Sequence, residues 1–251
     1  MVFSSLNFLC VFLPIVLAVY VICPKSWKNF WLMLSSLFFY AWGEPKYILI
    51  MLFSTVFDYM NGRLLEYFDK KNMAEQKKKK CRTGILVLSI VGNLGILFVF
   101  KYFDLLVSSW NHATDSSLGL LHLALPIGIS FYTFQTMSYT IDVYKHEVKA
   151  QHNIISFGMY VSMFPQLIAG PIVRYRLVEK QMKDRTVTME QWVAGMQRFL
   201  IGLGKKVLLA NQIGALWEDI SATTGGELSM AGAWFDPIKF PWINHAYHRD
   251  H

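Results

Sequence analysis

A polar stripe inside a long uncharged stretch is the strongest chemical signal in this sequence. Residues 125–135 read Leu-Pro-Ile-Gly-Ile-Ser-Phe-Tyr-Thr-Phe-Gln, and residues 141–144 read Ile-Asp-Val-Tyr. At about 100° per residue, one face of a helix here carries most of the polar side chains, namely Tyr132, Gln135, Thr136, Tyr139 and Asp142. These groups could position a substrate in a cavity, or they could hydrogen-bond neighbouring helices, and the sequence leaves both readings open.

A second polar interruption follows in residues 150–173, which contain no Lys, Arg, Asp or Glu. Prolines and glycines break this apolar segment, and broken backbone is tolerated in a membrane only where protein or a water-filled cavity surrounds it. The segment is therefore a candidate cavity wall. The residues that we expect to line a cavity are Tyr132, Gln135, Tyr139, Asp142, Pro165, Gln166, Gly170 and Pro171.

The elements that must position these residues are membrane helices. Residues 1–24 carry no charge, and the 251-residue chain is 54% hydrophobic and only 16% charged, well below the roughly 25% of an ordinary soluble domain. Because spanning backbone must satisfy its own hydrogen bonds, helices are the expected element. The sequence predicts an all-α membrane protein, a polytopic transmembrane helical bundle with short, broken or re-entrant helices.

The expected helices are apolar stretches separated by charged turns. The first begins at residue 6, and two short pieces flank Glu44-Pro45, where the proline ends a helix. Gly84, Gly92 and Gly95 would let another helix approach the fourth stretch closely. Lys205-Lys206 interrupts the last one. The stretches cover residues 6–23, 29–43, 47–62, 83–100, 116–141, 150–173 and 192–217, with an outer loop at 108–120.

The net charge of +7 is concentrated in one segment. Residues 69–82 hold seven Lys or Arg against Asp69 and Glu75, which gives +5 of the total. Short basic loops beside membrane spans mark the cytoplasmic side, so we expect this segment inside and the N-terminus outside, with anionic-lipid contact as a secondary role. No aromatic residue interleaves the Lys77–Lys80 run to stack on bases, which argues against a nucleic-acid partner.

Metal and nucleotide-loop chemistry have no support in the sequence. Cys10, Cys23 and Cys81 show no metal-ligand spacing, and neither an HExxH motif nor a glycine-rich phosphate loop occurs. His112 and His122 flank the expected outer loop and lack a nearby carboxylate or thiol, which is typical of surface residues. We expect no metal site and no bound cofactor.

Three separated motifs together resemble the membrane-bound O-acyltransferase (MBOAT) family, in its alginate O-acetylation branch. The first is the segment 125–144, and the second is Phe-Pro-Gln-Leu-Ile-Ala-Gly-Pro at residues 164–171. The start of the chain and the Phe-Tyr-Ala-Trp turn at residues 39–42 are similar to the same branch. The likeness extends over residues 1–234, with the motifs in the family's order.

The resemblance implies transfer of an acyl group, here acetyl, from a cytoplasmic donor towards an exported polysaccharide such as alginate. The implied donor is acetyl-CoA or an acyl carrier protein. The implied partners are membrane lipid, the polysaccharide acceptor and a periplasmic or extracellular acetyl-transfer protein. The implied location is the bacterial cytoplasmic (inner) membrane.

The family's catalytic histidine has no counterpart in this sequence. It stands in a Trp-His-Gly-like context as a general base, and no Trp here is followed by His. We therefore assign no catalytic residue. The polar residues 235–251 also lack the apolar span expected after Trp234, so we read residues 1–234 as the N-terminal part of the transmembrane domain and the tail as a truncation or frameshift product.

Two other function classes fit parts of the same pattern. A transporter or channel subunit would also use broken helices and a polar membrane face, although the internal repeats typical of transporters are not visible here. A non-catalytic assembly component of a polysaccharide O-acetylation complex is the third reading.

Overall fold

The computed structural model describes residues 5–114, 117, 119–121, 123–167, 173–183, 185 and 187–214. All regular elements of this part are helices, and it contains no strand. The chain divides into two compact units, one formed by Val16–Arg185 and the other by Met1–Ile15 with Thr186–His251. The tail at 235–251 lies outside the described residues, so its expected nature stays a prediction.

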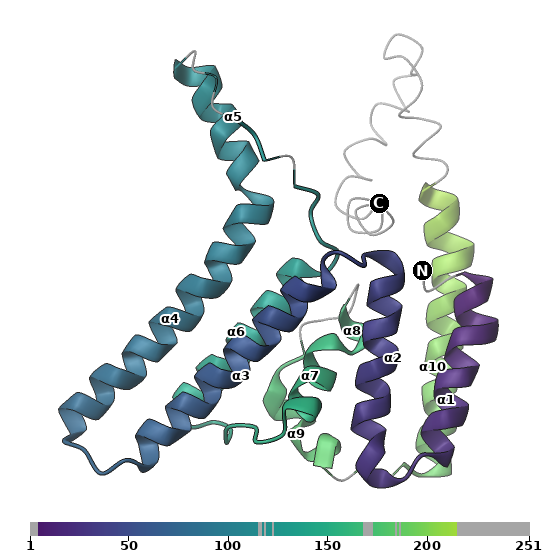
Figure 1. Cartoon of the computed structure of the whole chain (residues 1–251). Coiled ribbons are helices and arrows are strands. Elements are labelled where there is room, and N and C mark those ends of the chain that lie inside the picture. Colours follow the sequence, from purple (N-terminus) through teal and green to yellow (C-terminus); the bar gives the residue numbers. More distant parts are fainter. Residues whose placement is uncertain are drawn as a thin grey trace. The chain divides into compact units, whose positions relative to one another are not determined.

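The larger unit is an assembly of helices (Figure 1). The helix α1 (Leu13–Ile22) runs into it across the unit boundary and is followed by a single 3-10 turn at Lys25–Trp27. The helices that follow are α2 (Lys28–Gly43), α3 (Ile48–Lys70), α4 (Glu75–Lys101), α5 (Phe103–Thr114), α6 (Ile129–Tyr144), α7 (Ile154–Ser162), α8 (Phe164–Leu167) and α9 (Tyr175–Lys183). Helices α3, α4 and α6 pack against one another, and α2 packs on α7.

The smaller unit contains two helical stretches among its described residues. A π-helix covers Phe8–Phe12, ahead of α1. The helix α10 (Met189–Lys205) begins with a capping box, in which Thr188 accepts from the Gln191 amide while the Gln191 side chain accepts from the Thr188 amide. At the expected interruption, Lys205-Lys206, the α-helix ends and the chain continues directly as a π-helix at Lys206–Ala210.

Several expected boundaries also differ from the structure. The short piece at 47–62 is part of α3, whose 23 residues continue past Arg63 and Glu66 to Lys70, and α4 includes the lysine run within its 27 residues. Charged side chains at a helix end can stay in water while the backbone hydrogen bonds continue, so charge did not mark these ends. Residues 103–114, expected partly as loop, form α5. The 26-residue stretch at 116–141 yields a helix only from Ile129, after Pro126 and Gly128.

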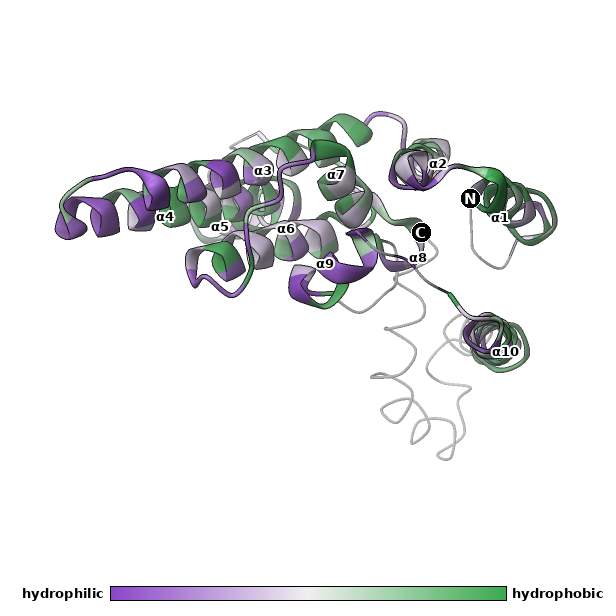
Figure 2. Ribbon diagram, turned by 90° about the horizontal axis from the view of Figure 1, so that it is seen from below, coloured by the Kyte–Doolittle hydropathy of each residue, from purple (hydrophilic) through white to green (hydrophobic). Residues whose placement is uncertain are grey.

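The helices α3 and α4 are long and apolar enough to cross a membrane, whereas Phe8–Ile22 is apolar but shorter. In α3 and α4, polar side chains are buried and large apolar side chains are exposed, which is the reverse of a soluble helical bundle. The buried face of α3 includes Ser54, Asp58 and Asn61, while Phe53 and Met60 on the other face are exposed. Figure 2 shows the contrast between these apolar helices and the hydrophilic connection that joins them. Such an arrangement is typical of helices whose outer faces meet lipid.

The expected close helix approach is confirmed at one of three glycines. A Cβ on Gly92 would lie 2.8 Å from the Phe57 ring of α3, so a larger residue at this crossing would require that ring to move. No heavy atom would lie within 4 Å of a Cβ on Gly84 or Gly95.

Candidate functional site

The turn before α6 is held in place by two other helices. Gly128 has φ +76°, which glycine adopts without strain, and a Cβ there would lie 2.7 Å from the Leu167 carbonyl oxygen of α8. The Ile127 amide donates to Glu44 Oε2 (2.9 Å), and Tyr40 Oη donates to the Ile127 carbonyl (3.1 Å). The Pro-Ile-Gly motif therefore fixes where the polar face of α6 begins.

Glu44 is held at this turn in a partly desolvated position. Burial raises the pKa of its carboxyl group, because the charged form loses water, while the hydrogen bond from Ile127 opposes part of that rise. The carboxylate therefore links the α2–α3 turn to the start of α6.

The polar face of α6 points into protein along its whole length. Tyr132, Gln135, Thr136, Tyr139 and Asp142 are all buried. Gln135 Nε2 donates to the Tyr160 carbonyl of α7 (2.7 Å), and Tyr139 Oη accepts from the Gln151 amide (2.9 Å). These two side chains bond neighbouring segments, which is the structural alternative that the sequence left open.

Two groups on that face have no hydrogen-bond partner among the described residues. They are Tyr132 Oη, whose residue is fully buried, and Asp142 Oδ2. A buried polar atom without a partner costs free energy, so each is a place where a water or a ligand group would be stabilised.

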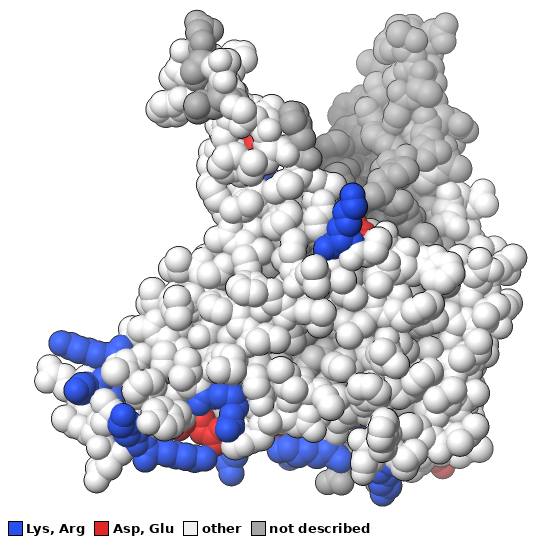
Figure 3. Space-filling view, viewed as in Figure 1, with Lys and Arg blue, Asp and Glu red and all other residues white. Residues whose placement is uncertain are grey.

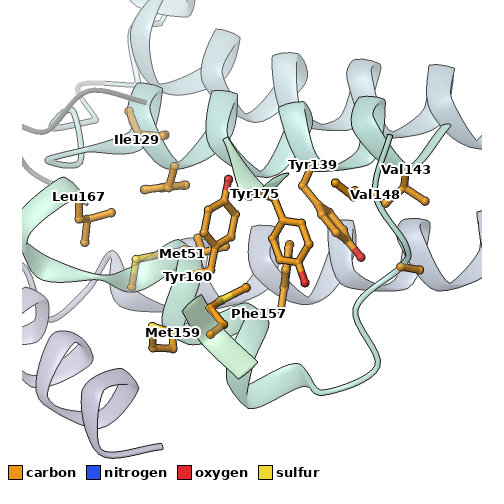
Figure 4. Close-up of a cluster of buried hydrophobic side chains, with 14 of the residues drawn as sticks. Met51, Ile129, Tyr139, Val143, Val148, Phe157, Met159, Tyr160, Leu167 and Tyr175 are labelled. Carbon is orange, nitrogen blue, oxygen red and sulfur yellow. The ribbon is translucent and has the colours of Figure 1, made fainter. Parts of the chain in front are cut away.

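The rings of three tyrosines meet in one cluster: Tyr139 of α6, Tyr160 of α7 and Tyr175 of α9. The Tyr139 and Tyr175 ring centroids lie 4.9 Å apart, and those of Tyr160 and Tyr175 lie 5.3 Å apart (Figure 4). Gln151 Nε2 donates to Tyr175 Oη (3.0 Å), and Tyr160 Oη donates to the Val173 carbonyl (2.8 Å). Burial, and next the Glu179 carboxylate, raises the pKa of Tyr175, so this phenol stays neutral.

The break expected around Pro165 is present, and it lies at Met163. Helix α7 ends at Ser162, Met163 is non-helical, and α8 starts at Phe164 with Pro165 in its first turn, where its missing amide costs nothing. Gln166 Nε2 donates to the Tyr160 carbonyl, the same oxygen that Gln135 uses. Gly170 and Pro171 lie outside the described residues.

A cavity of about 240 Å³ opens next to this break. Its wall is largely apolar, with Leu32 and Met163, and it is polar at Gln166, Gln181 and Arg185. Arg185 Nε donates to the Gln181 carbonyl (3.0 Å), whereas Nη1 is buried without an acceptor among the described residues. An apolar pocket with a few convergent polar groups is the usual form of a small-molecule site.

Of the six predicted cavity-lining residues that the structure describes, Gln166 lies on this wall. Tyr132, Gln135, Tyr139, Asp142 and Pro165 line neither this cavity nor the larger cleft at the basic end of the same unit. Gln135 is nevertheless joined to Gln166 through the shared Tyr160 carbonyl.

A buried polar cluster around Asp58 was missed by the sequence reasoning. Asp58 is fully buried on α3, and its carboxylate accepts from Ser89 Oγ (2.6 Å) and Asn93 Nδ2 (2.7 Å) on α4. Thr140 Oγ1 of α6 donates to the same carboxylate (3.2 Å). Asp58 is the one charged residue within the expected apolar stretch 47–62, and this was the available signal.

Comparison with known proteins gives relatives that cover nearly the whole chain. One is the "Probable alginate O-acetylase AlgI" of Pseudomonas aeruginosa, 39% identical over 98% of this chain and 48% of the relative. A protein of the same name from Azotobacter vinelandii is 34% identical over 96% of this chain and 47% of the relative. The "Peptidoglycan O-acetyltransferase" of Helicobacter pylori is 29% identical over 96% and 50%.

The chain thus spans about half the length of the curated relatives that it matches. No family model matches the chain. No solved structure matches it either. The predicted relationship is confirmed by these relatives: the chain is related, over nearly its whole length, to the O-acetyltransferases of the membrane-bound O-acyltransferase family.

Proposed function

We propose that this chain forms part of a membrane-bound O-acyltransferase that moves an acetyl group from a cytoplasmic donor towards an exported polysaccharide. The observation that carries the proposal is the similarity to O-acetylases over 98% of the chain. Alginate and peptidoglycan, the polymers in the relatives' names, set the acceptor class as a cell-envelope polysaccharide.

The inverted polarity of α3 and α4 supports the membrane part of the proposal. Exposed Leu, Val, Phe and Met side chains surround a buried polar centre at Asp58, which is stable where the outer surface meets hydrocarbon. The larger unit would then be part of a polytopic bundle in the bacterial inner membrane. The break between α7 and α8 fits a re-entrant segment, because Gln135 and Gln166 hydrogen-bond the Tyr160 carbonyl near it.

The charge distribution supports the orientation of the bundle. Most of the Lys and Arg side chains visible in Figure 3 gather along its lower edge. Contacts join several of the segments that carry basic residues. Arg82 of α4 contacts the turn after α6 through His146, and His152 of the next connection pairs with Glu66 of α3 (2.9 Å). Under the positive-inside rule this end, with residues 69–82, faces the cytoplasm, where an acetyl-CoA or acyl-carrier donor would arrive.

The role that we propose for the predicted polar residues is to line and support a cavity for donor or acceptor. Gln166 and Arg185 would hydrogen-bond the entering group, and Gln135 would hold the broken backbone from the α6 side. The proposal gives no residue of this sequence the role of catalytic base.

A chimera tests the proposal directly. The chain would be expressed in bacterial membranes alone, and also continued by the remaining part of the Pseudomonas aeruginosa relative. Transfer of labelled acetyl from acetyl-CoA to polysaccharide would be measured, with an exported acetyl-transfer partner supplied. We expect transfer by the chimera and none by the chain alone, because no base is assigned to it.

Robust transfer by the chain alone would contradict the absence of a catalytic base, and a folded, membrane-inserted chimera without transfer would contradict the function. The sharper comparison is Arg185→Gln against Arg198→Gln, because Arg198 is an exposed arginine of α10 outside the cavity. We expect Arg185→Gln to lower kcat/KM about tenfold or more, the worth of one charged hydrogen bond, and Arg198→Gln to leave it unchanged. Solute flux without acetyl transfer would favour the transporter alternative.

A further inference from the structure

The larger unit has a second cleft, of about 690 Å³, at its basic end. It lies between the last turn of α3, the first turns of α4 and the turn that follows α6. With the Asp69–Arg82 ion pair balanced, two lysines against one glutamate leave the cleft a net charge of +1; its lining residues are Asp69, Glu75, Gln76, Lys78, Lys79, Arg82, Tyr144 and His146. No step of the proposed acetyl transfer uses them.

The floor of the cleft is a hydrogen-bonded cluster built on Arg82. Its Nε lies 3.0 Å from Asp69 Oδ1, its Nη1 lies 2.6 Å from His146 Nε2, and its Nη2 donates to the Tyr144 carbonyl. The guanidinium also lies 5.0 Å from the centroid of the Tyr144 ring. Since Asp69 balances Arg82, the floor is held rigidly and close to neutral.

His146 stands in a conformation that normally selects glycine. Its φ is +61°, and the His146 and Glu147 amides donate to the Val143 and Asp142 carbonyls, which closes α6 with a Schellman motif. A non-glycine residue here costs about 1 kcal/mol. The strain places an imidazole on the cleft wall, and strained residues of this kind gather at functional sites.

The free positive charge of the cleft comes from Lys78 and Lys79. Neither ammonium makes an ion pair or hydrogen bond with a described residue, and Lys78 is half-buried. At about 100° per residue, Arg82 falls between Lys78 and Lys79 on the helix, whereas Lys77 and Lys80 fall on the opposite face. Only one half of the lysine run therefore faces the cleft.

The apolar part of α4 begins directly beyond this cluster. Thr83 follows Arg82, and Val87, Leu88 and Val91 on the next turns are exposed. If these side chains meet hydrocarbon, the cleft lies about one helical turn above it, at the depth of the lipid headgroups. Basic pockets between membrane helices at the cytoplasmic surface bind anionic headgroups.

We infer that this cleft binds the phosphate headgroup of an acidic phospholipid, with Lys78 and Lys79 contacting the phosphate above the Arg82 cluster. The inference shares with the proposed function only the placement of α4 in a bilayer and does not depend on acetyl transfer. A membrane anion fits better than a soluble one, because the apolar part of α4 begins at Thr83, directly below the cleft, and so places the cleft at the depth of the headgroups.

The test compares two double variants with the same change in charge. Lys78→Gln with Lys79→Gln removes the cleft charges, while Lys77→Gln with Lys80→Gln removes two charges from the opposite face of the same helix. The full chain in detergent would be titrated with phosphatidylglycerol and with phosphatidylcholine, and retained lipid counted by native mass spectrometry. Thermal unfolding of both variants shows that they remain folded.

We expect phosphatidylglycerol to bind more tightly than phosphatidylcholine, and the cleft variant to lose about tenfold or more of that affinity. The control variant should change it less than about twofold. Equal losses in both variants would mean general surface electrostatics and overturn the site, as would equal binding of both lipids. Displacement of the lipid by inorganic phosphate at matched concentration would assign the cleft to a soluble phosphate compound and overturn the lipid assignment.

Discussion

Replacing Asp58 by Ala should destabilise the packing of α3, α4 and α6 by about 3 kcal/mol. The carboxylate accepts hydrogen bonds from Ser89, Asn93 and Thr140, and a long one from Asn61 Nδ2 (3.5 Å), but these donors differ in what remains to them. Asn93 Nδ2 also donates to the Ser89 carbonyl (2.9 Å), and Thr140 Oγ1 to the Thr136 carbonyl (3.4 Å). The Ser89 hydroxyl (2.6 Å) would lose its one described acceptor, whereas the Asn61 side-chain amide would lose only a bond at the limiting distance of 3.5 Å.

The size of the expected loss of stability follows from this difference among the donors. One buried donor left without a partner costs about 1–3 kcal/mol, and the emptied space adds about 1 kcal/mol. The two donors with alternative acceptors add little, because hydrogen bonds between membrane helices average about 0.6 kcal/mol. Three donors orphaned together would instead cost more than about 5 kcal/mol.

The assay is reversible unfolding of the chain in bicelles or mixed micelles, followed by a probe on α6. Met60→Ala is the matched control, because Met60 lies on the exposed face of the same helix and should cost less than about 0.5 kcal/mol. The combined variant Asp58→Asn with Asn93→Asp exchanges amide and carboxylate, and should recover part of the loss suffered by Asp58→Asn alone. A loss for Asp58→Ala no larger than that of Met60→Ala would refute the idea that this cluster ties the three helices together.

Three further outcomes are expected from the same kind of measurement. Gly128→Ala should cost about 2–4 kcal/mol, because it combines a positive φ with a Cβ 2.7 Å from a backbone oxygen, whereas Gly158→Ala meets only the flexible Met33 sulfur at 2.8 Å and should cost less. At the αL position after α6, His146→Gly should be more stable than His146→Ala by about 1 kcal/mol, since both lose the ring and only alanine is strained; equal stabilities would contradict the assigned conformation. The pKa of Glu44 is raised, so the folded protein disfavours the charged form of this carboxyl group. The free energy of unfolding should therefore fall as pH rises from the usual pKa of 4.5 through the raised pKa, and Glu44→Gln should remove that part of the pH dependence. An unchanged pH profile in Glu44→Gln would show that the carboxyl group is not desolvated.

Periodicity predicted the polar face of α6 well, because a single helix determines it. Spacing alone brings Tyr132, Gln135 and Tyr139 to one face, and the structure buries all three. It could not predict the partners of that face, because these come from α7 and from the segment after Tyr144. The same holds for Gly128, whose need for glycine depends partly on the Leu167 oxygen of another helix.

The sequence pattern did not predict where α3 and α4 end, nor that Asp58 joins three helices. Lys and Arg did not mark where these helices end, since a helix can continue with its charged side chains extended into water. A single aspartate among apolar residues does not indicate, from the sequence alone, which residues its side chain contacts. Its meaning depends on Ser89 and Asn93, which lie one turn apart on the helix that follows.

The Asp58 cluster also constrains how α3 enters a membrane during synthesis. An aspartate at mid-helix makes insertion of a single segment unfavourable by about 2.5–3.5 kcal/mol. The donors that offset this penalty at Ser89 and Asn93 are on α4, which emerges from the ribosome only after the α3–α4 connection. If α3 and α4 cross the membrane as proposed, the two segments therefore have reason to leave the translocon together as a hairpin.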